Sequence, residues 1–248
     1  MQARYLGDSH DFLKYALLRQ LHTEFGGPVG LNWYLTDPEK VDPPARKDGE
    51  KRHHLHQPVW RACDPKLLDG LHAFQDPAHR RIADFETSGI MPTDTLFISE
   101  EVPTDPSERA KWHGRALARL SRCSVIFLDP DNGFEVKSMT PKRRPKYALF
   151  DEVRDYEELG AIVVTIQFAR QCSPETRAAA IETERRKRRL VDVPALPALR
   201  GRVAPNLLFF LGAPSQHHIR LIGALGELCN RLRSSNREPN KLEWLVDR

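Results

Sequence analysis

A short polar run, Asp129-Pro130-Asp131-Asn132, directly follows an apolar segment at 124–128. The apolar segment predicts a buried strand, and parallel α/β sheets bind ligands outside the carboxyl ends of their strands. Proline after the aspartate interrupts regular structure, which would leave the Asp129 carboxylate at the edge of the sheet. We predict catalytic roles for the members of this run, Asp129, Pro130, Asp131 and Asn132. The alternative is an ordinary turn, for which these residue types are standard.

A second polar run, from Gly7 to Asp11, precedes a segment at 11–25 in which leucines recur at helical spacing. Lys14 falls between two core-facing positions of that predicted helix. The run therefore predicts polar and charged groups at the start of a helix whose other face is buried. Simple capping by Ser9 or Asp11, with a Lys14 side chain that extends to solvent, is the alternative.

Basic residues gather in two short stretches, although the net charge of the chain is only +4. The members are Lys142, Arg143, Arg144 and Lys146 in the first, and Arg185, Arg186, Lys187, Arg188 and Arg189 in the second. Clusters of this kind attract the phosphate backbone of nucleic acids. We therefore expect a nucleic-acid partner, and a solvated helix face is the alternative for each stretch.

Predicted strands alternate with predicted helices along most of the chain. The strands lie at 29–35, 95–99, 124–128, 147–150, 161–166, 207–211 and 242–246, and the helices at 11–25, 64–86, 107–121, 174–190 and 214–232. Several strands are continuous apolar runs, which indicates a sheet covered on both faces. The sequence predicts an α/β, Rossmann-like, doubly wound fold with a mostly parallel sheet and a possible antiparallel edge strand at the C-terminus.

Length and composition favour one domain. The 248 residues are 40% hydrophobic, enough for one large core, and residues 1–248 are expected to form it with an irregular excursion at about 36–62. No apolar run reaches the ~18 residues of a membrane span, and no signal peptide is evident, so we expect a cytoplasmic protein without a membrane partner. Widely spaced cysteines predict neither zinc nor disulfides, and the His53, His54 and His56 tract is expected at the surface.

The order of the two polar runs resembles the large-subunit ribosomal RNA adenine-N6-methyltransferase family of the J type. That family has a Gly-Asn-His-Ala-Asp-x-x-Lys-His run before a helix, and Gly7, Asp11, Leu13 and Lys14 fit it. Asp129 and Pro130 fit the strand-terminal Asp-Pro-Pro-Tyr of the family. The C-terminal part is also similar, with a strand, Gly-Ala-Pro, a long helix and a closing Glu-Trp-Leu-Val.

The resemblance implies a class I fold that uses S-adenosylmethionine to methylate a base amine, with RNA as the favoured nucleic acid. Lys14 would lie near the cofactor, and Asp129 would accept a hydrogen bond from the exocyclic amine of an unpaired or flipped-out base. The predicted cofactor-binding set is Lys14, His10, Asp11, Asp37 and Glu100. The chain differs from the family pattern at Asp131 and Asn132, which replace Pro-Tyr, and it has no Gly-rich turn after the first strand.

Two other functions use the same residues. Acidic groups at strand ends could converge and hold Mg²⁺ or Mn²⁺ for metal-dependent phosphodiester cleavage. The carboxylates concerned are Glu100, Asp129, Asp131, Asp151 and Glu152. A non-catalytic nucleic-acid-binding protein that keeps the fold but not the cofactor site is the third possibility.

Overall fold

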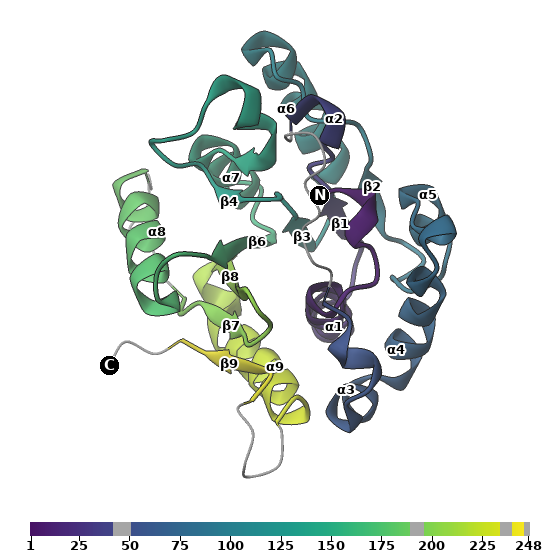
Figure 1. Ribbon diagram of the computed structural model, residues 1–248. Coiled ribbons are helices and arrows are strands. Elements are labelled where there is room, and N and C mark those ends of the chain that lie inside the picture. Colours follow the sequence, from purple (N-terminus) through teal and green to yellow (C-terminus); the bar gives the residue numbers. More distant parts are fainter. Residues whose placement is uncertain (42–50, 189–195, 234–239, 246–248) are drawn as a thin grey trace.

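A single seven-stranded sheet forms the centre of the computed structural model, which describes residues 1–41, 51–188, 196–233 and 240–245 (Figure 1). The strand order is β2-β1-β3-β6-β8-β7-β9. Helices cover both faces of the sheet, so the prediction of a Rossmann-like α/β fold is confirmed. Within the described residues, no helix is long and apolar enough to cross a membrane.

The strands divide into a parallel half and a half with reversed strands. Strands β2 (Leu96–Ile98), β1 (Val29–Asn32), β3 (Val125–Leu128) and β6 (Ile162–Ala169) pair in parallel. Strand β8 (Asn206–Gly212) is antiparallel to β6 and to β7 (Leu199–Gly201), so β7 runs in the direction of β6. Strand β9 (Leu242–Trp244) pairs antiparallel with β7 and forms the predicted C-terminal edge.

Alternate residues of the buried strands feed two hydrophobic cores, one on each face of the sheet. In β3, Val125 and Phe127 join one core, whereas Ile126 and Leu128 join the other. The first core is covered by helices α1 (Ser9–Phe25), α3 (Pro58–Cys63), α4 (Pro65–His72), α5 (Ile82–Glu86) and α9 (His218–Arg231). The second is covered by α6 (Pro106–Leu120), α7 (Phe150–Glu157) and α8 (Pro174–Arg188).

One predicted strand, at 147–150, does not belong to the main sheet. Its first residues form β5 (Tyr147–Ala148), which pairs only with β4 (Gly133–Phe134) in a separate two-stranded sheet. Helix α7 begins at Phe150, so Asp151 and Glu152 lie in its first turn. Acidic residues are favourable there because the helix N-terminus carries partial positive charge. The prediction that these two carboxylates stand at a strand end is therefore wrong.

The predicted helix at 64–86 is interrupted. It divides into α4, two short 3₁₀ segments (Ala73–Gln75 and Pro77–His79) and α5. Asp8, and neither Ser9 nor Asp11, caps α1 by accepting backbone N–H bonds, and Asp105 caps α6 in the same way. Of the irregular excursion, residues 42–50 lie outside the described part, and a short helix, α2 (Pro38–Val41), precedes them.

The connections of β1 create a topological switch point. From β1 the chain continues to β2 on one side, and it then returns to β3 on the other side of β1. Helices leaving neighbouring strands in opposite directions open a crevice at the carboxyl ends of those strands, where such folds bind ligands. Helix α1 precedes β1, so its N-terminus lies at this same end of the sheet.

Candidate functional site

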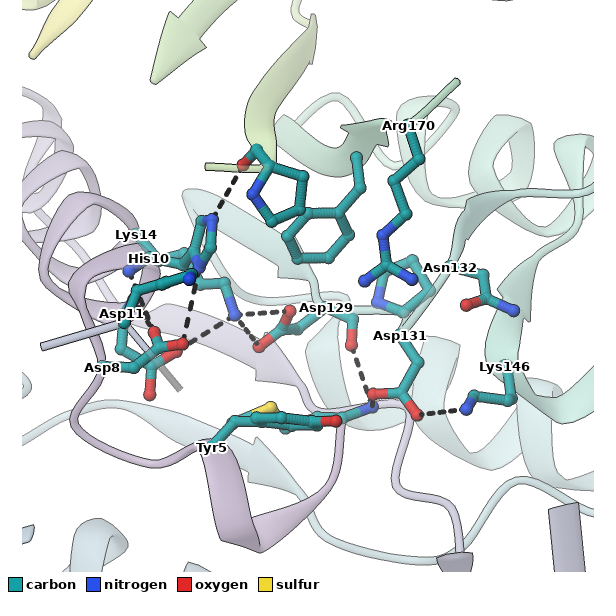
Figure 2. A pocket seen from close by; sticks show the side chains of 15 residues that line it. Tyr5, Asp8, His10, Asp11, Lys14, Asp129, Asp131, Asn132, Lys146 and Arg170 are labelled. Atoms are coloured by element: carbon teal, nitrogen blue, oxygen red, sulfur yellow. Dashed lines mark hydrogen bonds and ion pairs between the residues drawn. The ribbon is translucent and has the colours of Figure 1, made fainter. Parts of the chain in front are cut away.

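A pocket of about 290 Å³ opens at the carboxyl ends of β3 and β6, beside the N-terminus of α1. Its volume is close to the lower limit of ligand pockets, which is roughly 300 Å³. Seven of the predicted site residues line it together: His10, Asp11, Lys14, Asp129, Pro130, Asp131 and Asn132 (Figure 2). Residues more than 100 positions apart in sequence thus meet where the fold places a ligand.

The Lys14 ammonium joins the two polar runs. Its Nζ donates to Asp11 Oδ1 and to Asp129 Oδ2, each at 3.0 Å, and all three side chains are buried. Burial alone would lower the pKa of Lys14, but the charges of Asp129 and Asp11 outweigh it and raise that pKa above its ordinary value. Lys14 is therefore a permanent cation at the centre of the pocket wall.

The pKa values of Asp8 and Asp11, at the N-terminus of α1, are shifted in opposite directions. Asp8 caps the helix and contacts the His10 ring, and despite burial the His10 and Lys14 charges hold the pKa of Asp8 below its ordinary value. Asp11 also accepts from the Gly7 N–H at 3.0 Å. Burial raises the pKa of Asp11 to about 6, because the Asp8 and Asp129 charges offset the attraction of Lys14. Of Asp8 and Asp11, it is therefore Asp11 that takes up a proton at the higher pH.

Asp131 stands apart from the Lys14 cluster and has cations of its own. Its carboxylate lies 3.2 Å from the Met1 ammonium and 3.5 Å from Lys146 Nζ, and it accepts from Thr36 Oγ1 at 3.1 Å. Although burial opposes it, these charges lower the pKa of Asp131. Asp131 is thus a fixed anion, better suited to holding the pocket together than to moving protons.

The turn at residues 129–133 is fixed to β6 by one buried side chain, Gln167. Its carboxamide accepts from Phe134 N–H at 2.9 Å and donates to the Asn132 carbonyl at 3.2 Å. Gly133 has φ +86°, and a Cβ at that position would collide with the Gln167 carboxamide. Glycine is required there because the turn approaches β6 so closely.

The turn after β1 uses a tyrosine where a glycine would be unstrained. Tyr34 adopts φ +46°, a left-handed conformation that is uncommon for a bulky residue. Three contacts hold it: its N–H bonds Asn32 Oδ1, its carbonyl accepts from the Met1 ammonium, and its hydroxyl donates to Glu152. The absence of a Gly-rich sequence therefore does not prevent a tight turn at the switch point, and such strain is typical of functional sites.

Several predicted site residues do not reach the pocket. Asp37 pairs with Lys40, Glu100 with Arg115 and Asp151 with Arg154, all near the surface. Glu152 is buried but is bound to Arg109. The carboxylates proposed for a metal-dependent phosphodiesterase therefore do not converge, and no cluster of three or more potential metal ligands occurs in the described ranges.

The basic stretches are only partly available to a partner. Lys142 and Arg143 are exposed and Arg144 is half-buried, in the 3₁₀ segment Pro141–Lys146 that also places Lys146 in the pocket. In the second stretch Arg186, Lys187 and Arg188 are exposed, whereas Arg189 lies outside the described residues. Arg185 is wrongly predicted to face a partner, because it is buried and paired with Glu157 and Glu182, each at 2.6 Å.

Sequence reasoning missed a group of pocket residues that lie outside the two polar runs and the two basic stretches. They are Met1, Tyr5, Lys51, Phe168, Arg170 and Pro205. Phe168 and Arg170 had a recognisable signal, because β6 extends to Ala169 and the strand-end rule would then have included both. Pro205 contributes its carbonyl, which lies 2.9 Å from His10 Nε2 and fixes that ring.

His54 is the residue of the histidine tract that contradicts the predicted surface position. It is fully buried in the 3₁₀ segment His53–Leu55, its Nδ1 lies 2.9 Å from Ser9 Oγ, and its ring contacts Phe12 and Trp60. Burial lowers the pKa of His54 to about 4. This neutral imidazole therefore supports the first turn of α1, which carries the pocket residues.

The buried His54 predicts acid sensitivity. The unfolded chain binds a proton at this histidine below pH ~6.5, whereas the folded protein does so only near 4, so its contribution is intact above pH 6.5 and is lost as pH falls. Between pH 7 and 5 we expect about 2 kcal/mol of that loss. Urea unfolding of wild type and His54→Asn at pH 7 and pH 5 measures this loss. The free energy of unfolding should fall more between the two pH values in wild type than in the variant. His56→Asn, at an exposed position, is the control and should follow wild type; an equal pH response in all three proteins would contradict the assignment.

Comparisons with known proteins return nothing: no family model, no curated protein and no solved structure matches this chain. What the pocket does has to be inferred from its own residues, distances and charges.

Proposed function

We propose that this protein is an S-adenosylmethionine-dependent methyltransferase that acts on a base amine of a nucleic acid, with RNA as the favoured substrate. The observation that carries the proposal is the meeting of Lys14 and Asp129 at 3.0 Å, in a pocket at the carboxyl ends of β3 and β6 of a Rossmann-like sheet. These are the residues that the resemblance to ribosomal RNA methyltransferases singled out.

The donor set of the pocket fits the chemistry of this cofactor. S-adenosylmethionine carries a cationic sulfonium and ammonium, a carboxylate and a planar adenine. The α1 side of the pocket offers the carboxylates of Asp8 and Asp11 for the cations and the exposed Lys51 ammonium for the carboxylate. The Tyr5 ring, also in the lining, provides an aromatic surface for the adenine. When bound there, the cofactor would supply an electrophilic methyl group.

Asp129 would position the nucleophile. Its carboxylate is held on one side by Lys14 Nζ, and its backbone carbonyl accepts from the Met1 ammonium at 3.2 Å. A carboxylate fixed in this way can accept a hydrogen bond from an exocyclic amine and orient the nitrogen lone pair, and such positioning supplies much of the rate in group transfer. The base has to leave its stack to reach this depth.

Cofactor binding tests the first half of the proposal. We expect S-adenosylhomocysteine to bind in isothermal titration calorimetry and, at 100 times its Kd, to stabilise the fold by about 2.7 kcal/mol. Tritium transfer from S-adenosylmethionine to total cellular RNA should fall at least ~100-fold in Asp129→Asn, because the amide is uncharged and replaces one of the two acceptor oxygens by an NH2 donor at a site where positioning supplies the rate. Asp151→Asn, an exposed carboxylate on α7, is the matched control. Absence of binding, together with absence of transfer, would overturn the proposal.

Salt dependence tests the nucleic-acid half. We expect the Lys142→Ala/Arg143→Ala variant to bind single-stranded RNA more weakly, with a log Kd against log salt slope smaller by about 1 for each lost phosphate contact. The control is Arg119→Ala/Arg122→Ala, which removes two exposed charges where α6 ends and the chain leads into β3. This is the end of β3 away from the pocket, so the salt slope should stay unchanged. Salt-dependent RNA binding by the wild type without any cofactor binding would instead identify a non-catalytic nucleic-acid-binding protein.

A further inference from the structure

We propose that Asn132 and Arg170 form the subsite that recognises the target base, with Arg170 as its stacking surface and Asn132 as its hydrogen-bonding group. The inference rests on the proposed function and assigns the substrate side of the same pocket. It also explains how a chain with Asp131-Asn132 in place of Pro-Tyr can hold a planar ring.

The pocket has two halves with Asp129 between them (Figure 2). Asp8, His10, Asp11 and Lys14 occupy the α1 half. Asn132 and Arg170 occupy the other half, on the strand-end side of Asp129. A methyl donor on the α1 side and an acceptor on the strand-end side would therefore face each other across the one carboxylate that orients an amine.

Asn132 has a backbone fixed by hydrogen bonds and a side chain that is available to a ligand. Its backbone N–H donates to the Lys146 carbonyl at 2.9 Å, and its carbonyl accepts from Gln167 Nε2 at 3.2 Å. Its side-chain carboxamide lines the pocket and makes no hydrogen bond with any described residue. A fixed backbone with a free carboxamide offers one donor and one acceptor side by side, the pattern with which asparagine reads a base edge.

Arg170 provides a flat cationic surface at the rim. Its guanidinium carbon lies 5.0 Å from the centroid of the Phe168 ring, and the His10 ring meets Phe168 edge-on at 5.3 Å. Arg170 is exposed and forms no ion pair with the described residues, whereas Lys14 and Lys146 of the same pocket are paired. Guanidinium planes stack on splayed-out bases, which is how single-stranded RNA is commonly bound.

A base explains this half of the pocket better than a phosphate does. Phosphate oxygens only accept hydrogen bonds, so the side-chain oxygen Oδ1 of Asn132 would have no donor to bind. The nearby Asp129 carboxylate would also repel a dianion at this depth. A neutral planar ring with an exocyclic amine meets neither obstacle.

Saturation-transfer NMR with the four ribonucleosides, in the presence of S-adenosylhomocysteine, tests the subsite. We expect binding of a nucleoside with an exocyclic amine and none of uridine. Asn132→Ala and Arg170→Ser should each weaken nucleoside binding at least 10-fold while the Kd for S-adenosylhomocysteine stays within twofold of wild type. Arg119→Ala is the matched control for loss of an exposed arginine.

The outcomes separate the two proposals. Nucleoside binding that depends on both residues supports the subsite even where S-adenosylhomocysteine does not bind, in which case only the cofactor assignment fails. Loss of S-adenosylhomocysteine affinity in Arg170→Ser with nucleoside binding unchanged would overturn the subsite and place Arg170 on the cofactor. Binding of nucleoside monophosphates but of no nucleoside would overturn it in favour of a phosphate site.

Discussion

Replacing Lys14 by methionine is expected to lower the free energy of unfolding by about 3–5 kcal/mol, the range for removing one partner of a buried ion pair. The ammonium balances the carboxylates of Asp11 and Asp129 at 3.0 Å, and both of these are buried. Methionine preserves most of the volume but leaves the two anions facing each other in a region of low dielectric constant. Urea unfolding at pH 7 measures the loss, and we expect the folded fraction of the variant to bind no S-adenosylhomocysteine.

The pH dependence of the variant identifies the cause. In wild type the pKa of Asp11 is already raised from 3.8 to about 6, so the folded protein takes up a proton before the unfolded chain does. This group's contribution to stability therefore increases as pH falls from about 6 toward 4, and without Lys14 the increase should be larger. The difference in stability between Lys14→Met and wild type should narrow at pH 5; a constant difference would point to lost packing instead of unbalanced charge.

Lys40 is a matched control within the same chain. It also lies between two carboxylates, with its Nζ 3.3 Å from Asp37 and 3.0 Å from Glu101, but its side chain is 67% exposed. Water and salt screen such a pair, so Lys40→Met should unfold like wild type. The contrast isolates burial as the variable, because ion-pair number and distance are nearly equal for the two lysines.

Lys14 and Asp129 also show how far the sequence leads toward the site. Both residues belong to polar runs next to strongly apolar elements. The rule that ligands bind at strand ends indicated Asp129, and the family resemblance added Lys14. The same rule failed for Asp151 and Glu152, because a two-residue strand, β5, is too short to distinguish from the start of α7 by apolar pattern. Sequence patterns thus located the site where elements are long and buried, and misplaced residues where they are short.

Helix α6 shows a second limit. Its small and apolar residues include Ala110, Leu117 and Leu120, yet Ala110 is exposed and the buried face contains Arg109 and Trp112. An arginine on the buried face has no hydrophobic signal of its own. Its place depends on a partner that is distant in sequence, Glu152, which only the assembled fold reveals. Polar networks of this kind are the part of the structure that apolar periodicity cannot predict.

Hydrogen bonds of Arg109 and Glu152 connect the 3₁₀ segment that carries Lys146 to the turn at Tyr34 after β1. The Arg109 guanidinium binds the Glu152 carboxylate through two nitrogens, at 2.6 and 2.8 Å. It also donates to the carbonyls of Arg144 at 2.8 Å and Tyr147 at 2.7 Å, at the end of the segment that places Lys146 beside Asp131. Glu152 in turn accepts from the hydroxyl of Tyr34, the residue with positive φ after β1. One buried arginine therefore holds two parts of the pocket's support.

We expect Arg109→Met to lower the free energy of unfolding by about 3–5 kcal/mol, because it leaves a buried carboxylate without its cation and two carbonyls without donors. Arg109→Lys should recover only part of this, since an ammonium cannot reproduce the planar fork. Hydrogen exchange should accelerate at 141–149 before the central strands are affected. Arg115→Met, on the same helix and paired with Glu100 at the surface, should change neither quantity. If Arg109→Met and Arg115→Met unfold alike, the network does not support the pocket, and the position of Lys146 must depend on β4 and β5 instead.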